Sequence, residues 1–220
     1  MKVLIIIPAY NEEESIEKVI NNLKQNYSQY DYVIINDGSH DHTSEICHKN
    51  KYKIIDLPVN LGLTGAFQTG LKYAYKKGYD YAIQFDADGQ HLPEYIPAMV
   101  DKIEEGYDMV IGSRFVEKPK PRSLRMLGSR VISTAIKITT GVHIADPTSG
   151  MRLFNKTLIR EFAENINYEP EPDTVSFLIK QGVKVAEVQV EMKEREAGES
   201  YLNLSRSIVY MTKMFVSIIV

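Results

Sequence analysis

The feature that most constrains this chain is a regular alternation of strand-length apolar runs and helix-period segments through its first half. The runs are short and rich in β-branched residues, and the segments between them repeat apolar residues every three or four positions. Such alternation favours an α/β fold, with a mostly parallel central sheet and helices on both faces. The expected strands are 3–8, 32–36, 53–57, 81–85 and 109–112, and the expected helices are 12–25, 43–49, 65–77 and 93–104.

The second half of the chain continues less regularly. Helices are expected at 123–140 and 173–181, strands at 151–154 and 184–192, and an apolar, amphipathic segment at 205–220. The 220 residues contain no internal repeat and no break in composition, so a single domain is expected. Asp41 or Thr43 is expected to cap the second helix and Thr64 the third, because short polar side chains bind the free N–H groups of helix starts.

Composition narrows the class of protein further. Hydrophobic residues make up 44% and charged residues 25%, which excludes collagen-like, disordered and multi-span membrane classes. A formal net charge of −3 argues against a nucleic-acid partner, which needs a basic excess. The single cysteine, Cys47, cannot form an internal disulfide, and we expect it in a helix, partly buried. The N-terminal apolar run is too short for a signal peptide, so a reducing, cytoplasmic location is expected.

Polar residues follow four of the expected strands. PAYNE follows the first, DGS the second, DADGQH the fourth and SR the fifth. Ligands of such sheets bind beyond the carboxyl ends of the strands, so these acids, amides and one arginine are expected to converge on one rim. A buried core has no need of them, and the rim is therefore the expected ligand site.

Asp86 and Asp88 are the most chemically specific feature of this rim. Two carboxylates this close repel each other unless a cation or a proton lies between them. A divalent ion, Mg²⁺ or Mn²⁺, shared with a substrate diphosphate fits this arrangement, and Gln90 and His91 could add ligands. The alternative is a solvated acidic turn, because Asp and Gly are common turn residues. The apolar strand that leads into the pair favours the metal site.

The turn after the first strand lacks a glycine-rich loop. A Rossmann dinucleotide site needs GxGxxG there and a P-loop needs GxxxxGK[ST], and neither motif occurs in the chain. The turn is instead suited to form one wall of a binding site for a flat nucleotide base. Asp37 could accept hydrogen bonds from the base edge or from a ribose, or it could stand in the N-terminal turn of the second helix.

Five motifs occur in order through about the first 115 residues, namely IIIPAYNEEES, VIINDGSHDHT, NLGLTGAFQTGL, FDADGQH and IGSR. Their order and spacing resemble those of family 2 glycosyltransferases, which implies the GT-A fold. Two later segments, DPTSGMRLF and REAGES, are similar to segments of dolichyl-phosphate mannose synthases and related polyprenyl-phosphate glycosyltransferases. The resemblance implies a GT-A domain at 1–204, with a nucleotide-sugar-binding half at 1–115 and an acceptor-side half at 116–204, followed by an amphipathic helix at 205–220.

The resemblance also implies roles by position. The nucleotide base and ribose would be lined by Pro8, Ala9, Tyr10, Glu12 and Asp37. The acidic turn would contact the nucleotide through Asp86 and Ala87 and hold the metal through Asp86, Asp88 and Gln90. Arg114 would meet phosphate oxygens of the donor or of a phosphorylated acceptor and belongs to the catalytic candidates, and Arg195 would reach the donor diphosphate.

The stretch 114–137 carries a strong local charge that the total conceals. It holds seven basic residues and one acid, a net charge of +6, so the rest of the chain carries −9. Arginine side chains bind phosphate oxygens bidentately, which favours a lipid phosphate or an anionic membrane surface as partner. The alternative is a solvated helix face, which explains most runs of charge.

The catalytic base is the least determined part of the site. Transfer to a hydroxyl needs a carboxylate near the acceptor oxygen, and Asp173 or Glu171 is the candidate. Two prolines in YEPEPDT depart from the pattern of the resembled family, and Asp173 could simply cap its helix. Transfer to a lipid phosphate needs no base, because that acceptor is already an anion.

These observations together predict an inverting, metal-dependent glycosyltransferase. The expected donor is a nucleoside diphosphate sugar, with UDP favoured, and the expected acceptor is a lipid-linked or cell-surface glycan, with polyprenyl phosphate as the alternative. Competing interpretations are a sugar-nucleotide pyrophosphorylase and a non-catalytic nucleotide-sugar-binding or membrane-docking module. The segment 205–220 could be an interfacial helix, a core helix or the start of a longer segment, and contact with the inner face of the cell membrane is expected.

Overall fold

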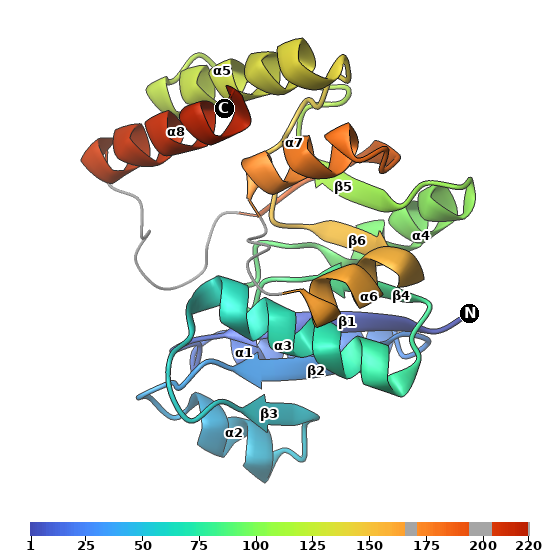
Figure 1. Ribbon diagram of the computed structural model, residues 1–220. Helices are drawn as coiled ribbons and strands as arrows, with labels where there is room; N and C mark the ends of the chain where they lie inside the picture. Colours follow the sequence, from blue (N-terminus) through green and yellow to red (C-terminus); the bar gives the residue numbers. More distant parts are fainter. Residues whose placement is uncertain (166–170, 194–203, 220) are drawn as a thin grey trace.

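The computed structural model describes residues 1–165, 171–193 and 204–219 and contains one seven-stranded sheet (Figure 1). The strands lie in the order β3-β2-β1-β4-β6-β5-β7, and every pair is parallel except the two made by β6. Their bounds are β1 (Val3–Ala9), β2 (Asp31–Asn36), β3 (Ile54–Asp56), β4 (Tyr81–Gln84), β5 (Met109–Ser113), β6 (Arg152–Asn155) and β7 (Val185–Gln189).

Two layers of helices cover the sheet, as the alternation of the sequence predicts. The helices are α1 (Ile16–Asn26), α2 (Thr43–Lys49), α3 (Gly62–Lys77), α4 (Ile96–Glu104), α5 (Leu124–Thr140), α6 (Lys156–Glu164), α7 (Pro172–Lys180) and α8 (Leu204–Ile219). Side chains of β1 alternate between the layers, because successive strand residues point to opposite faces. Leu4 and Ile6 join a core with α3, α5, α6, α7 and α8, whereas Ile5 and Ile7 join one with α1, α2 and α4.

The reversed direction of β6 determines which residues lie at the carboxyl ends of the parallel strands, an edge of the sheet that we call the functional edge. The carboxyl ends of β1, β2 and β4 lie at one edge of the sheet, and antiparallel β6 begins there rather than ends. Residues just before β6, such as Ser149 and Gly150, therefore stand beside the loops that follow the parallel strands. Open α/β sheets bind ligands in a crevice at this edge, beyond the carboxyl ends of the strands.

The predicted elements agree well with the observed ones. All seven expected strands are confirmed, and all seven expected helices are present; α2 has the expected bounds, and the other six have shifted ends. Helix α6 was not predicted, and its start is fixed by the Asn155 side chain, which accepts a hydrogen bond from the N–H of Leu158. Cys47 is completely buried in α2, and burial raises the pKa of its thiol to about 11, which suits a core residue rather than a nucleophile.

The predicted helix caps are partly wrong. Helix α3 begins at Gly62, so Thr64 lies inside its first turn, and Asn60 accepts the hydrogen bond of the Gly62 N–H instead. The side chain of Asp41 does accept from the Thr43 N–H at the start of α2, but its second oxygen accepts from Glu13. That bond helps to hold residues 12–15 as a turn, so α1 starts at Ile16, later than the expected position 12.

The C-terminal helix α8 packs on α5 and α7, as expected of a core helix. Met214 and Ile218 are buried in the core, whereas Val209 and Val216 are exposed. Gly128 of α5 faces Met211, so closely that a Cβ at this position would overlap the methionine sulfur. Within the described ranges, no helix has the length and apolar character needed to cross a bilayer.

Candidate active site

A cavity of about 640 Å³ opens at the functional edge of the sheet. The strand ends form its floor and the helices α3, α5 and α8 form its walls, so segments from both halves of the chain contribute. The lining consists of Pro8, Ala9, Tyr10, Glu12, Asp37, Asn60, Gly62, Leu63, Ala66, Gln84, Asp86, Ala87, Asp88, Met126, Ser129, Thr148, Ser149, Gly150, Arg152, Glu171, Tyr210 and Met211. Its size suits a ligand with several rings and phosphate groups.

The end of the cavity beside β1 and β2 contains all five residues expected to line the base and ribose. Asp37 is buried there, and its Oδ1 accepts a hydrogen bond of 2.7 Å from the N–H of Leu61. The bond attaches Asp37 to the start of α3, so the alternative that placed it in the first turn of the second helix is wrong. Gly38 has a φ of +67°, and a Cβ there would lie 2.8 Å from the Asn60 nitrogen, which explains the glycine.

Asp86 and Asp88 both line the middle of the cavity, above the end of β4. Asp88 is nearly buried, and its Oδ1 accepts a 3.0 Å hydrogen bond from the N–H of Gln90, whose side chain does not line the cavity. Across the described part of the chain, no cluster of three or more His, Cys, Asp or Glu side chains has metal-site geometry. Two carboxylates nevertheless fit Mg²⁺ or Mn²⁺, which often take one or two protein carboxylates and complete their shell with substrate phosphates and water.

The buried ring of His91 holds the acidic turn in place. Its Nδ1 accepts a 2.9 Å hydrogen bond from the Asp86 N–H, and its Nε2 lies 3.4 Å from Asp86 Oδ2. Because Nδ1 accepts, the proton of the ring is on Nε2, facing the carboxylate. His91 also forms a β-bridge with Met192, so the turn is tied to the segment after β7. His91 is therefore placed to orient the Asp86 carboxylate.

Arg114 does not line the cavity but forms a mostly buried ion pair with Asp146, in which the arginine side chain is 24% and the aspartate side chain 0% exposed. Its Nε and Nη2 donate to the two carboxylate oxygens at 2.6 and 2.9 Å, and its backbone N–H donates as well. Burial opposes ionisation of Asp146, but the hydrogen bonds and charge of Arg114 outweigh it and hold the pKa of Asp146 below its usual value. The segment DPTSG thus supplies the partner that fixes Arg114, a role the sequence did not indicate.

The two candidate bases occupy different positions. Glu171 lines the cavity, and its carboxylate accepts a hydrogen bond from the hydroxyl of Tyr210 on α8. Asp173 lies outside the lining and accepts from Ser217 at 2.7 Å. The proposal that Asp173 caps its helix is wrong, since the N-cap position of α7 is Glu171. Burial, followed by the Glu171 charge, raises the pKa of Tyr210, which therefore remains a hydrogen-bond donor.

Several lining residues were not found from the sequence. Gln84 and Arg152 form part of the polar floor, and Met126, Ser129 and Met211 belong to the α5 and α8 wall. Arg152 is buried, and its guanidinium donates to the carbonyl oxygens of Ser149, Pro147 and Glu171. The DPTSG motif pointed to the neighbourhood of Arg152, but no sequence signal marked Gln84 or the wall.

The basic stretch 114–137 is partly neutralised by local partners. Lys118 pairs with Glu191, and Arg130 donates to the backbone oxygen of Lys120. Lys120 is half buried and donates to the hydroxyls of Ser129 and Ser133, at 2.9 and 3.0 Å. Burial lowers the pKa of the Lys120 ammonium. Ser129 lines the cavity, so the Lys120 charge stands directly behind the α5 wall. Arg195, expected at the donor diphosphate, lies outside the described residues.

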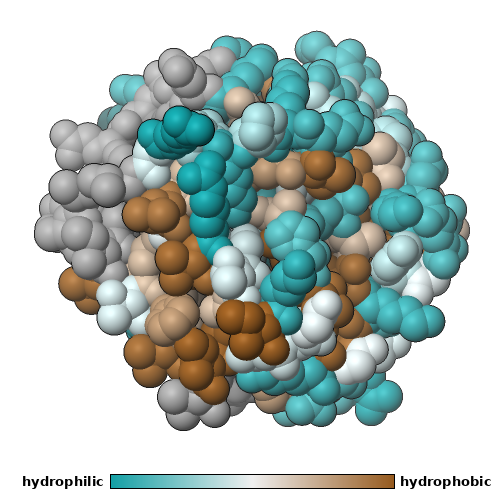
Figure 2. Space-filling model, turned by 90° about the horizontal axis from the view of Figure 1, so that it is seen from above, coloured by the Kyte–Doolittle hydropathy of each residue, from teal (hydrophilic) through white to brown (hydrophobic). Residues whose placement is uncertain are grey.

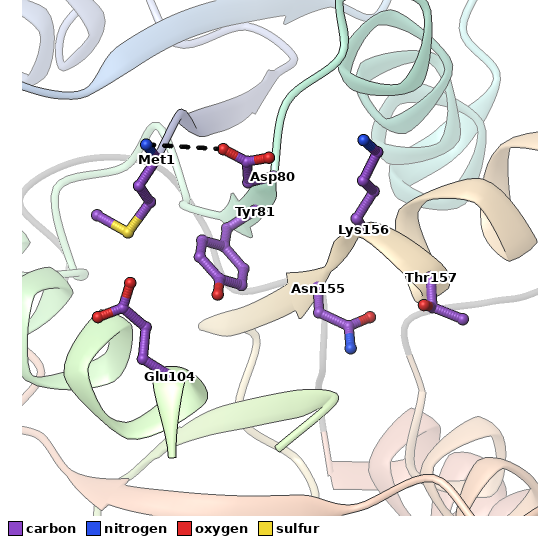
Figure 3. Close-up of a pocket in the computed structure, with 7 residues that line it drawn as sticks. All are labelled: Met1, Asp80, Tyr81, Glu104, Asn155, Lys156 and Thr157. Carbon is purple, nitrogen blue, oxygen red and sulfur yellow. Dashed lines mark ion pairs between the residues drawn. The ribbon is translucent and has the colours of Figure 1, made fainter. Parts of the chain in front are cut away.

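A second cavity, of about 290 Å³, lies at the opposite edge of the sheet (Figure 3). The N-terminal ammonium group of Met1 lies 3.9 Å from Asp80 there, and Glu104 and Lys156 add charges of both signs. This cavity adjoins the start of β4 and contains none of the motif residues. The larger cavity is therefore the candidate active site.

Comparisons with known proteins agree with this assignment. Residues 4–162 match the family described as Glycosyl transferase family 2. The chain is 33% identical to a UDP-N-acetylglucosamine–dolichyl-phosphate N-acetylglucosaminyltransferase of Methanococcus voltae, over 86% of this chain and 84% of that protein. It is 27% identical to a polyprenol monophosphomannose synthase of Mycolicibacterium smegmatis, over 92% and 81% of the two chains.

The fold resembles that of solved glycosyltransferases. A crystal structure of glucosyl-3-phosphoglycerate synthase from Mycobacterium tuberculosis, in complex with Mn²⁺, UDP and phosphoglyceric acid, superposes with a TM-score of 0.71. The sequence identity is 17%, and the match covers 98% of this chain and 76% of that one. The match over residues 4–162 and the relative at 33% identity lead to one conclusion: the chain belongs to glycosyltransferase family 2 and is a glycosyltransferase with the GT-A fold.

Proposed function

We propose that this protein transfers a sugar from a nucleoside diphosphate sugar, with UDP favoured, to a polyprenyl phosphate, with inversion at the anomeric carbon. The observation that carries the proposal is one cavity lined by the predicted nucleoside residues, by Asp86 and Asp88, and by the α5 and α8 wall. Several relatives are named for transfer to dolichyl, polyprenol or undecaprenyl phosphate. Polyprenyl phosphate is therefore better supported than the glycan acceptor expected from the sequence.

In the proposed mechanism, the residues at the β1 and β2 ends bind the base and ribose, and Asp86 and Asp88 hold a Mg²⁺ or Mn²⁺ ion. Such an ion would offset the negative charge that develops on the leaving diphosphate. An oxygen of the acceptor phosphate attacks the anomeric carbon from the face opposite the diphosphate. The new C–O bond forms as the bond to the diphosphate breaks. No proton has to be removed, because the acceptor oxygen is already anionic.

The main test is the variant Asp88→Asn, which removes a carboxylate without changing the size of the side chain. Transfer of labelled sugar from UDP-N-acetylglucosamine or UDP-glucose to undecaprenyl phosphate, measured with Mn²⁺, should fall about a hundredfold or more. The exposed Asp101 on α4 provides the matched control, since Asp101→Asn removes the same charge far from the cavity. Undiminished transfer by Asp88→Asn, or by the wild-type protein in excess chelator, would refute the metal-dependent mechanism.

The second candidate function is transfer to a hydroxyl, because the carboxylate of Glu171 lines the cavity. A general base typically contributes about 10²–10⁴-fold in rate. If the acceptor is a phosphate, Glu171→Gln should slow transfer by less than about tenfold, since Gln still accepts the hydrogen bond from Tyr210. A larger loss that disappears at high pH would favour the hydroxyl acceptor.

We also propose that α5 and α8 dock on an anionic membrane surface. Leu127, Val131 and Ile138 are exposed along one side of α5, and exposed Arg130 and Lys137 stand among them. On α8, Val209 and Val216 are exposed as well. Figure 2 views the molecule from the side of these helices and shows hydrophobic residues gathered between hydrophilic ones. An apolar face with basic residues suits the boundary of an anionic bilayer, where a lipid acceptor is found.

A further inference from the structure

The amide of Gln84, at the floor of the cavity, has an unpaired buried acceptor. Gln84 is the last residue of β4, it is 1% exposed, and it lines the cavity together with Ala66 and Arg152. Its Oε1 is fully buried and has no hydrogen-bond partner among the described residues. Leaving such an acceptor unpaired destabilises the folded protein, so an unpaired one at a ligand cavity calls for a functional explanation.

The neighbouring cation does not satisfy this oxygen. The antiparallel register of β4 and β6 pairs Ile83 with Leu153, and one further step sets Arg152 opposite Gln84. The guanidinium of Arg152 nevertheless donates from Nε, Nη1 and Nη2 to three backbone carbonyls. Its hydrogen bonds therefore hold the chain around β6 and leave the Gln84 amide, whose Nε2 is the Gln84 atom nearest to a Cβ placed at Gly150, to a ligand of the cavity.

Gly150 leaves room for such a ligand. A Cβ at Gly150 would lie 3.5 Å from Oδ2 of Asp86 and 3.8 Å from Nε2 of Gln84, both ordinary contact distances. The glycine therefore keeps open a space between the acidic turn and the amide. A ligand group in this space touches the proposed diphosphate site on one side and Gln84 on the other.

The order of the strands indicates which part of a donor reaches this space. The residues predicted to bind the nucleoside stand at the carboxyl ends of β1 and β2, and the acidic pair stands at the end of β4. The next strand in the sheet is β6. A nucleoside diphosphate sugar laid along this edge therefore brings its sugar over Gln84 and Gly150. Sugar hydroxyl groups are donors, which is the chemistry that an unpaired amide oxygen requires.

We propose that Gln84 is a specificity-determining residue whose side-chain amide forms a hydrogen bond with a hydroxyl group of the transferred sugar. This inference rests on the proposed function, since it assumes a nucleoside diphosphate sugar in the cavity. A site that is built to bind a hydroxyl group discriminates strongly against ligands that lack it, because its own polar group is then left unpaired.

The test compares nucleotides with and without a sugar. Dissociation constants of UDP, UDP-glucose and UDP-N-acetylglucosamine are measured with Mn²⁺ for wild-type and Gln84→Met protein, with GDP and GDP-mannose as a second series. We expect the substitution to weaken binding of the preferred sugar nucleotide about tenfold or more and to leave its parent nucleotide within about twofold. The Tm of the unliganded variant should stay the same or rise, because an unpaired buried acceptor is replaced by an apolar group of similar shape.

Two further variants make the outcome unambiguous. Gln68→Met is the matched control, because the Gln68 amide lies outside the cavity and donates to the carbonyls of Phe162 and Asn165. It should lower Tm and leave both affinities unchanged. Gly150→Ala should weaken binding of the sugar nucleotide selectively, because its methyl group fills the open space at distances the fold tolerates.

Three results would overturn the inference while leaving the proposed function standing. They are unchanged binding by Gln84→Met, an equal loss for nucleotide and sugar nucleotide, and a fall in Tm like that of the Gln68 control. An equal loss would assign the amide to the diphosphate or to the hydration of the metal ion. Failure of the wild-type protein to bind any of the five nucleotides would instead refute the proposed function, and the inference with it.

Discussion

At the scale of single residues, the ion pair between Arg114 and the buried Asp146 shows how the loop that follows β5 is fixed in position. The Asp146 side chain is 0% exposed, and it accepts hydrogen bonds from the backbone and the guanidinium of Arg114 and from Thr148. Breaking a buried pair by removing one partner leaves an uncompensated charge and costs about 3–5 kcal/mol. The pair therefore fixes the loop that follows β5.

The first prediction concerns Asp146→Asn. We expect the free energy of unfolding to fall by about 3 kcal/mol at neutral pH, because Arg114 loses its anion, and denaturant titration measures this change. The pKa of Asp146 is lower in the folded protein than its ordinary value of 3.8. Its contribution to stability is therefore complete well above that value and is lost as the pH falls through the folded pKa.

Wild-type protein should accordingly lose this part of its stability on acidification below about pH 4, and Asp146→Asn should lose less over the same range. Asp101→Asn, which removes an exposed carboxylate from α4, serves as the control and should follow the wild-type curve. If the free energy of unfolding depends on pH in the same way for wild-type and Asp146→Asn, the stabilising role of the Arg114–Asp146 ion pair is contradicted.

At the scale of elements, the contact of α3 with β1 depends on a small residue. Gly70 of α3 lies over Ile6 of β1, and a Cβ at Gly70 would come 2.2 Å from the Ile6 Cγ2 atom. Ile6 is fully buried and branched at Cβ, so its side chain cannot swing aside. The helix therefore approaches the sheet more closely than an alanine would allow, and this position brings its first turn to the cavity.

The second prediction follows from that contact. Gly70→Ala should destabilise the protein by about 1–3 kcal/mol through overpacking, despite the better helix propensity of alanine. In an Ile6→Ala background, where the obstructing methyl groups are absent, the same substitution should cost much less. A double-mutant cycle by denaturant titration measures the difference, and a coupling energy near zero would mean that the helix shifts without strain.

At the scale of the whole molecule, function depends on where the charged and apolar surfaces lie relative to the cavity. The α5 and α8 wall carries exposed apolar residues on its outer side and contributes Met126, Tyr210 and Met211 to the cavity on its inner side. In the proposed arrangement, this wall holds a lipid acceptor whose chain stays in the bilayer while its phosphate enters the cavity. Arg130 and Lys137, which are exposed among the apolar residues of α5, favour an anionic bilayer.

The third prediction tests that arrangement by co-sedimentation with vesicles. Binding should be stronger to phosphatidylcholine vesicles that contain phosphatidylglycerol than to phosphatidylcholine alone, and salt should weaken it. Ile138→Asp, at a residue that is 79% exposed, should reduce binding several-fold without lowering Tm, because the residue contributes little to the core. Val59→Asp changes an exposed apolar residue before α3 and is the control. Equal effects of the two substitutions would argue against docking through α5.

The sequence by itself determined the strands, most of the helices and the residues at the β1 and β2 end of the cavity. Those features depend on local patterns, namely apolar periodicity and the polar residues that follow a strand, and parallel strand ends must meet at one edge. Only the tertiary structure decided the rest: that Asp146 binds Arg114, that Tyr210 reaches Glu171, and that the Gln84 amide lies beside Gly150 with its oxygen unpaired. These contacts arise from the reversal of β6 and the return of α8 to the cavity, and they join residues far apart in the chain whose spacing carries no signal.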